Sequence, residues 1–128
     1  MNITAYEHIG TRVSDRQRAL AFYQSLGFRI ELEDESDAIE LINSNGVRIN
    51  LIVNADKDHC GSNILLDEPA RRPGHTHIAY VVSSIEDSVA YVTRLGIRIT
   101  DGPKQADRRR YFFIRDPDQN VLEFNELG

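Results

Sequence analysis

The stretch GHTHIAYVV at residues 74–82 places two histidines at the head of an apolar run of the kind that forms a buried strand. A second strand-like stretch, HIGTRV, also opens with a histidine, His8. Neutral imidazole is a common ligand for divalent transition metals. Two strand-opening histidines are therefore candidates for one metal site, provided that the elements around them bring them to a shared surface.

The chain contains an internal duplication. One copy, HIGTRVSDRQRALAFYQSLGFRI, begins at His8, and the other, HIAYVVSSIEDSVAYVTRLGIRI, begins at His77. The two histidines are 69 residues apart, and so are Gly27 and Gly96. A repeated pattern of this length indicates two modules of the same structure.

Each module begins with a strand and a helix. A serine, Ser14 or Ser83, follows each histidine strand, and we predict that it caps the next helix. Glycine at 27 and 96 is expected to end the helices in a left-handed conformation. The apolar helix faces are predicted from the spacing of Ala19, Phe22, Tyr23 and Leu26 in the first module and of Val89, Val92 and Leu95 in the second.

Three further strands are expected in each module. They are 28–33, 38–42 and 47–53 in the first and 97–100, 111–115 and 121–126 in the second. The order is βαβββ twice, which predicts an α+β fold with modules at about 1–55 and 73–128 and a linker at 56–72. We expect one domain over residues 1–128.

Alternation along the strands predicts which side chains share a face. If Ile9, Thr11 and Val13 face the helix, then His8 and Arg12 face away from it. The same reasoning turns His77 away from the helix of the second module. The same alternation turns Arg48 and Asn50, in the last strand of the first module, away from the helix. It does the same for Glu123 and Asn125 in the last strand of the second module.

Two histidines and a glutamate on such faces form a plausible 2-His-1-carboxylate metal site with open positions for substrate. The predicted ligands are His8, His77 and Glu123. A single strand histidine is more often structural, but the repeated histidine and the phase-matched glutamate favour a metal. An alternative cluster of His59, Cys60 and His75 lacks an evident fourth ligand.

The run QADRRRYFFIRDP suggests a place for an anion. Arg108, Arg109 and Arg110 precede a strand whose outward side should show Tyr111, Phe113 and Arg115. Arginine grips carboxylates and phosphonates with paired hydrogen bonds. We predict substrate contacts from Asn50, Arg12, Arg48, Arg110, Phe113 and Arg115. The competing interpretations are that the arginines form a solvated charge run and that the aromatic residues lie at a dimer contact.

Composition limits the class of protein. The 128 residues carry a net charge of −5, which disfavours nucleic acid and anionic membranes as partners. Cys60 is the only cysteine, so no disulfide within the chain is expected. No leader pattern and no membrane-spanning apolar run are evident, and we expect a cytoplasmic protein.

The motifs resemble the vicinal oxygen chelate superfamily, which includes glyoxalase I, extradiol dioxygenases, fosfomycin resistance proteins and bleomycin-binding proteins. The residues that carry the resemblance are the histidine before TRVSD, AFYQSLGF, GHTHIAYVV and FFIRDPDQNVLEF. The resemblance implies paired βαβββ modules in a cupped, mostly antiparallel mixed sheet with helices outside. It also implies a divalent metal at His8, His77 and Glu123, and a homodimer that completes the cup.

One position departs from glyoxalase I. Asn50 stands where that enzyme calls for a glutamate, and an amide cannot accept a proton as a carboxylate does. The remaining ligands resemble those of extradiol dioxygenases and fosfomycin thiol transferases, with Fe, Mn, Zn or Ni as the metal. Glu123, Tyr111 and Glu40 are the candidates for proton transfer.

The sequence thus predicts a metal-dependent enzyme for a small, anionic substrate with adjacent oxygens. Its chemistry would be that of a dioxygenase or of a lyase, isomerase or thiol transferase. A metal-free protein that binds a drug or metabolite, as bleomycin-binding relatives do, is the alternative.

Overall fold

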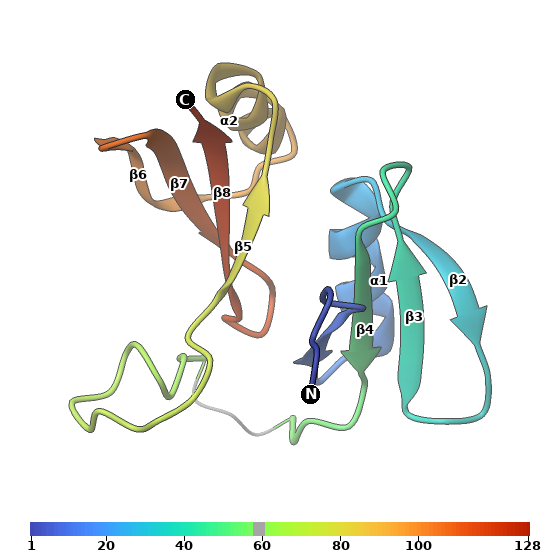
Figure 1. The fold of residues 1–128 in the computed structure, drawn as a ribbon. Helices are drawn as coiled ribbons and strands as arrows, with labels where there is room; N and C mark the ends of the chain where they lie inside the picture. Colours follow the sequence, from blue (N-terminus) through green and yellow to red (C-terminus); the bar gives the residue numbers. More distant parts are fainter. Residues whose placement is uncertain (58–60) are drawn as a thin grey trace. The chain divides into compact units, whose positions relative to one another are not determined.

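The computed structural model describes residues 1–57 and 61–128. The chain divides into two compact units, Met1–His59 and Cys60–Gly128. Each unit contains one four-stranded sheet and one helix in the order βαβββ (Figure 1). The predicted α+β fold with two duplicated βαβββ modules is confirmed.

The first unit contains the following elements: β1 (Ile9–Arg12), α1 (Arg16–Ser25), β2 (Arg29–Glu33), β3 (Ala38–Ile42) and β4 (Arg48–Ile52). The strand order is β1-β4-β3-β2. Strands β1 and β4 are parallel, and the other neighbours are antiparallel, so the sheet is mixed.

The second unit repeats this topology with β5 (Ile78–Val81), α2 (Ile85–Arg94), β6 (Ile99–Ala106), β7 (Arg109–Arg115) and β8 (Val121–Leu127). The strand order is β5-β8-β7-β6, again with one parallel pair, β5 and β8. Each histidine of the duplication, His8 or His77, lies one residue before the first strand of its unit.

Each sheet buries one face under its helix, as the alternation of residues predicts. In the first unit the fully buried side chains include Tyr23 of α1 and residues of β3 and β4, namely Ile39, Leu41, Ile49 and Leu51. In the second they include Ile85 of α2, Phe112, Ile114 and Leu122. We call the opposite face of each sheet its open face.

The helices begin one residue later than predicted. Asp15 and Ser84 are the caps: the Asp15 side chain accepts from the Arg18 amide at 2.8 Å, and Ser84 Oγ accepts from the Asp87 amide at 3.1 Å. The prediction of Ser14 was wrong because Ser14 is buried, and its hydroxyl accepts from the Arg18 side chain at 3.3 Å.

The helix ends agree with the prediction. Gly27 and Gly96 follow the last helical turns with φ of 98° and 74°, a conformation that glycine adopts without steric cost. On α2, however, Leu95 is exposed, and Ile85 and Val92 form the buried face.

The strands β6 and β7 are longer than predicted. The segment GPKQA belongs to β6, and β7 begins at Arg109, so the arginine run lies on a hairpin and not before the strand. Register shifts between Ile99 and Lys104 accommodate Gly102 and Pro103 on this edge strand. Glycine and proline are tolerated at such edges and bulges, so they do not end β6 at residue 100, where the prediction ended it.

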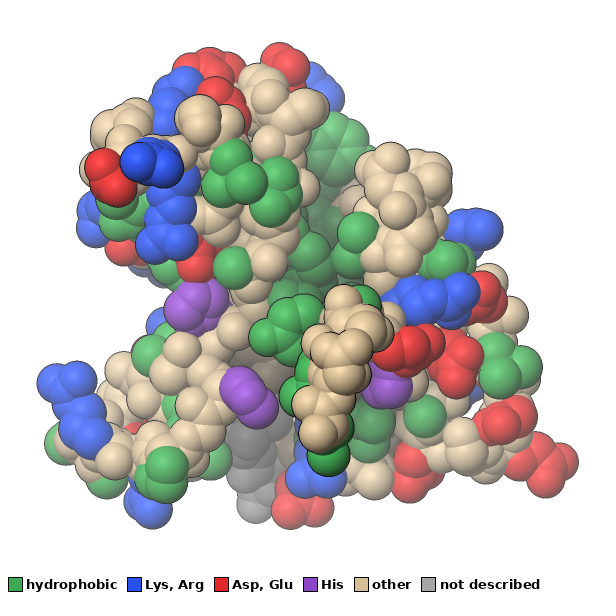
Figure 2. Space-filling model, viewed as in Figure 1, with side chains coloured by type: hydrophobic (Ala, Val, Ile, Leu, Met, Phe, Trp, Pro, Cys, Tyr) green, Lys and Arg blue, Asp and Glu red, His purple; other side chains and the backbone are tan. Residues whose placement is uncertain are grey.

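Neither helix in the described ranges is long and apolar enough to cross a membrane. On the face drawn in Figure 2, side chains of both charge signs are present.

Candidate metal and anion site

The side chains of His77 and Glu123 meet in the second unit. His77 Nε2 lies 2.8 Å from Glu123 Oε2. Glu123 is 4% exposed, whereas 32% of the His77 side chain is exposed. A buried carboxylate thus has an imidazole partner that solvent can reach.

Strand register explains why they meet. Ala79 of β5 is paired with Glu123 of β8, which is paired with Phe113 of β7. Paired residues point to the same face, and His77 has the phase of Ala79. The prediction that His77, Glu123 and Phe113 share the open face agrees with this register.

The His77 ring has two further neighbours. Its Nδ1 lies 2.9 Å from Thr76 Oγ1, and the ring meets Phe113 edge-on with centroids 5.5 Å apart. A hydrogen bond at one ring nitrogen selects the tautomer that leaves the other nitrogen available as a ligand. Thr76 is a functional candidate that the sequence prediction missed, although it adjoins His77 in the chain.

Asn125 was predicted to face this surface but was given no role. It lies two positions after Glu123 on the open face and is 4% exposed. Its Nδ2 donates to the Tyr80 carbonyl at 3.4 Å, but among the described residues nothing pairs with its Oδ1. An unpaired buried acceptor costs folding free energy, which makes Asn125 a candidate for a contact that the fold itself does not supply.

Tyr111 and Phe113 form an aromatic wall on the same face. Their rings are edge-on with centroids 5.8 Å apart. The Arg109 guanidinium carbon lies 5.4 Å from the centre of the Tyr111 ring. The two-residue periodicity of the strand could have identified Arg109, because residues 109, 111 and 113 share a phase.

Arg115 continues this phase along β7 and is paired with Val121. Its two terminal nitrogens bind Asp67, with distances of 2.5 and 2.8 Å to the two carboxylate oxygens. The hydrogen bond from Arg115 lowers the pKa of Asp67 to about 2, and the same bond raises the pKa of Arg115. The predicted anion-binding side chain is therefore on the open face and has an internal carboxylate partner.

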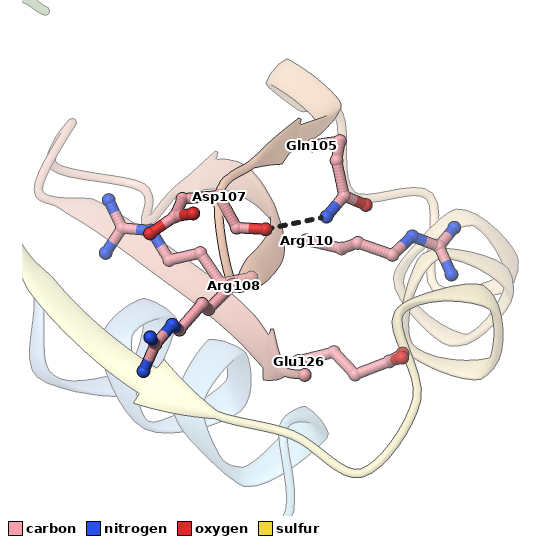
Figure 3. A pocket seen from close by; sticks show the side chains of 7 residues that line it. Gln105, Asp107, Arg108, Arg110 and Glu126 are labelled. Atoms are coloured by element: carbon pink, nitrogen blue, oxygen red, sulfur yellow. Dashed lines mark hydrogen bonds between the residues drawn. The ribbon is translucent and has the colours of Figure 1, made fainter.

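Arg110 does not share the open face. Its Nη1 lies 2.5 Å from Glu86 of α2, and Arg110 is paired with Glu126 across the strands. Figure 3 shows a pocket at the β6–β7 turn, where Arg110 and Glu126 extend toward α2 and Arg108 extends away from it. The structure brings Arg109, and not Arg110, to the side of Tyr111.

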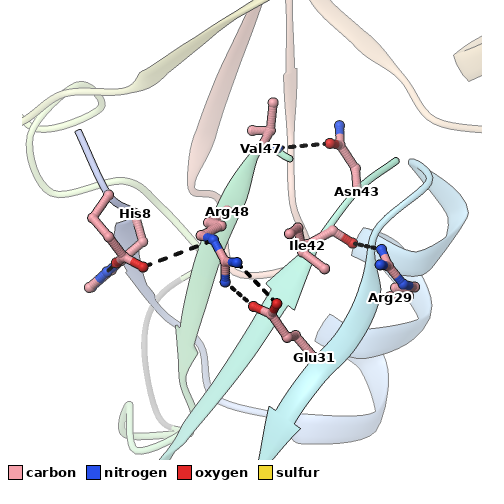
Figure 4. A network of polar contacts seen from close by, with 8 residues as sticks. His8, Arg29, Glu31, Ile42, Asn43, Val47 and Arg48 are labelled. Atoms are coloured by element: carbon pink, nitrogen blue, oxygen red, sulfur yellow. Dashed lines mark hydrogen bonds and ion pairs between the residues drawn. The ribbon is translucent and has the colours of Figure 1, made fainter. Parts of the chain in front are cut away.

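The first unit carries the remaining predicted residues. Asn50 lies between Gly10 and Glu40 on the open face, and Arg12 is paired with Ile52. Arg48 forms a two-pronged ion pair with Glu31, and its Nε lies 4.0 Å from Glu7 (Figure 4). His8 is exposed and contacts Glu7 through Nδ1.

The His77–Glu123 pair fits a divalent metal. Two donors with metal bonds of about 2.1 Å at roughly 90° are about 3 Å apart, close to the observed 2.8 Å separation. Among the described residues, no group of three or more His, Cys, Asp or Glu side chains is arranged to hold a metal ion. The third ligand, His8, belongs to the other unit and remains a prediction. His59 and Cys60, of the alternative cluster, lie outside the described residues.

The sequence of the chain matches one protein family. The sequence model of the Glyoxalase/Bleomycin resistance protein/Dioxygenase superfamily matches residues 5–124. The chain is a member of that superfamily, as its motifs predicted.

Individual relatives support the assignment. The chain is 27% identical over 128 residues to "Metallothiol transferase FosB" of Lysinibacillus sphaericus (strain C3-41), covering 98% of this chain and 84% of the relative. Among solved structures it resembles a glyoxalase/dioxygenase from Nostoc punctiforme (TM-score 0.73, 19% identity, 100% and 99% coverage). It also resembles TnmS3, an antibiotic binding protein from Streptomyces sp. CB03234 (TM-score 0.75, 18% identity, 100% and 99% coverage).

Proposed function

We propose that this protein is a divalent-metal-dependent enzyme that acts on a small anionic substrate with adjacent oxygens. The observation that carries the proposal is the contact between the accessible imidazole of His77 and the buried carboxylate of Glu123 on one sheet face. A bound Fe, Mn, Zn or Ni ion would supply Lewis acidity toward the substrate oxygens.

Each residue of the chain has a separate task in this proposal. His77 and Glu123 hold the ion, with His8 as the third ligand, in a homodimer or within one chain. Thr76 accepts the Nδ1 proton of His77 and so fixes the ring with Nε2 as the donor atom. The edge-on contact with Phe113 limits rotation of that ring.

The aromatic and cationic residues of β7 would bind the substrate. Phe113 and Tyr111 provide an apolar wall beside Glu123, and Arg115 provides a guanidinium two residues further along the same face. Asn50, Arg12 and Arg48 would add polar contacts from the first module. Tyr111 has the only hydroxyl on the described open face of β7, which makes it the proposed proton donor, with Glu123 as a second proton-transfer group.

Among the reaction types, thiol transfer has the most support, because the FosB relative is named a metallothiol transferase. Dioxygenase, lyase and isomerase chemistry would use the same ligands. A metal-free protein that captures a drug or metabolite is the competing function. We further propose that the protein works in the cytoplasm.

Metal binding is the test of this function. Protein freed of metal with a chelator is titrated with Mn²⁺, Fe²⁺, Zn²⁺ and Ni²⁺, and binding and thermal stability are followed. The expected result is one ion per site, with an increase in Tm because the ion binds only the folded state. Glu123→Gln, which keeps the size of the side chain, should lose this increase.

The reaction type is tested on the loaded protein. Consumption of a thiol with fosfomycin, and of oxygen with a panel of catechols, distinguishes transfer from dioxygenation. A wild-type protein that binds none of the four ions would overturn the enzyme proposal and favour the binding protein.

A further inference from the structure

The guanidinium of Arg115 has an internal partner. Its two terminal nitrogens bind the two carboxylate oxygens of Asp67, 48 residues away in the sequence, at 2.5 and 2.8 Å. This two-pronged geometry is the one with which arginine binds carboxylate and phosphonate ligands. The carboxylate of Asp67 therefore occupies the position that a substrate anion would take on Arg115.

Asp67 is held there by its own segment. Its carboxylate accepts from the Asn63 amide at 2.7 Å, and its amide donates to the Asn63 carbonyl at 2.8 Å. The Asn63 side chain donates to the carbonyl of Gln119 at 3.1 Å, which attaches the segment to the β7–β8 connection. A tethered carboxylate has a high effective concentration at Arg115, so it competes with every anion in solution.

Solvent reaches the ion pair. The exposed fractions of the Arg115 and Asp67 side chains are 23% and 29%. Ion pairs with this exposure are weak enough to exchange with other anions, since screening limits their net strength. The pair is therefore a partly exposed contact that anions in solution can reach.

We propose that Asp67 is a built-in competitor at the Arg115 subsite, which a phosphate-, phosphonate- or carboxylate-type anion must displace before it binds the guanidinium. This inference rests on the proposed function, in which Arg115 binds the anionic part of the substrate. A monocarboxylate offers the same oxygens and charge as Asp67 but must come from solution. A dianion adds a second charge and a third oxygen, which keeps its attraction above that of the tethered carboxylate.

The test compares acetate with inorganic phosphate at constant ionic strength and a pH of about 8, where phosphate is mainly a dianion. The full chain is titrated with each anion while the side-chain Nε–H resonance of Arg115 is followed by NMR. Asp67→Asn keeps the size of the side chain but removes its charge. We expect this variant to bind both anions about two- to fivefold more tightly, and by a similar factor, because a tethered competitor lowers the affinity of every anion that must displace it.

A matched control is available one residue away. Glu68 pairs with Arg72 at 3.7 Å, and Glu68→Gln makes the same change in net charge without touching Arg115. Its anion affinities should equal those of the wild type. Adding Arg115→Gln to Asp67→Asn should abolish the gain. Asn63→Ala, which loosens the tether but keeps the Asp67 charge, should give a smaller gain in the same direction.

Unchanged affinities in Asp67→Asn, or an equal gain in Glu68→Gln, would overturn the inference. Measurement on both metal-free and metal-loaded protein separates it from the proposed function. A gain in Asp67→Asn without any metal binding supports Asp67 as the competitor and rejects the metal enzyme. Normal metal binding without that gain supports the metal enzyme and rejects Asp67 as the competitor.

Discussion

The two units have the same framework and different open faces. The register places Asn50 opposite Gly10 in the first unit and Glu123 opposite Ala79 in the second, so Asn50 and Glu123 are equivalent positions. At this equivalent position of the last strand, the first unit therefore has an amide and the second a carboxylate. Among the described residues, the strand-opening histidine contacts a carboxylate of the last strand in the second unit, whereas His8 of the first unit contacts the neighbouring Glu7.

The strand partners of Asn50 and Glu123 also differ in polarity. Glu40 of β3 corresponds to Phe113 of β7, because they are the antiparallel partners of Asn50 and Glu123. Phe113 helps to bury Glu123, whereas Asn50 beside Glu40 remains half-exposed. The comparison teaches that duplication kept the helix-covered core and changed the open faces, where chemistry is decided.

The core side should be equally important in both units. Phe112 and Ile39 are equivalent, and both are 0% exposed. Phe112→Ala should lower the free energy of unfolding by about 3–5 kcal/mol, and Ile39→Ala by about 2–5 kcal/mol, because each leaves a cavity. Urea denaturation measures both. A loss below about 1 kcal/mol at either site would contradict the view that the two cores are alike.

The histidines test whether the units share one site. His77→Ala should reduce metal affinity more than about 100-fold with little change in stability, because removing a ligand costs more than removing a residue behind it. His8→Ala should cause a similar loss if both units contribute ligands. Calorimetric titration with Mn²⁺ and Zn²⁺ provides the affinities. Full metal affinity in His8→Ala would confine the site to the second unit.

Asn125 and Ile52 are equivalent positions with opposite polarity. Asn125→Leu should raise the free energy of unfolding by about 1 kcal/mol, since the buried unpaired oxygen disappears. The reverse change, Ile52→Asn, should lower it by about 1 kcal/mol. Thermal and urea unfolding of both variants test the pair. A clear loss of stability in Asn125→Leu would show that this amide has a structural partner after all.

The Asp67–Arg115 pair has no equivalent contact among the described residues of the first unit, where Ile42 stands at the position of Arg115. The pKa of Asp67 falls from 3.8 unfolded to about 2 folded, so its contribution to stability is present above pH 3.8 and is lost as the pH falls toward 2. Asp67→Asn should show a shallower loss of stability over this acid range. Identical acid profiles for wild type and variant would rule out this contribution.

Local patterns made much of the fold predictable. The histidine-to-glycine repeat identified two βαβββ modules, and alternation along β8 separated Leu122 from Glu123. The strand at Tyr111 was predicted too short, because Arg109 and Arg110 already belong to β7 and a short turn connects it to β6. Arg110 then turns toward Glu86 of α2, a partner that strand periodicity alone does not reveal.

The sequence by itself determined the duplicated framework, the helix stops at Gly27 and Gly96, and the shared phase of His77 and Glu123. These features depend on local backbone preferences and on the two-residue period of strands, both of which are written into neighbouring residues. Tertiary structure alone decided that Asp67 binds Arg115, that Asn125 Oδ1 is buried with no partner in the described part of the chain, and that Arg110 contacts Glu86 of α2. Those outcomes depend on which distant segments pack together, and pairings across 48 residues leave no periodic signal in the chain.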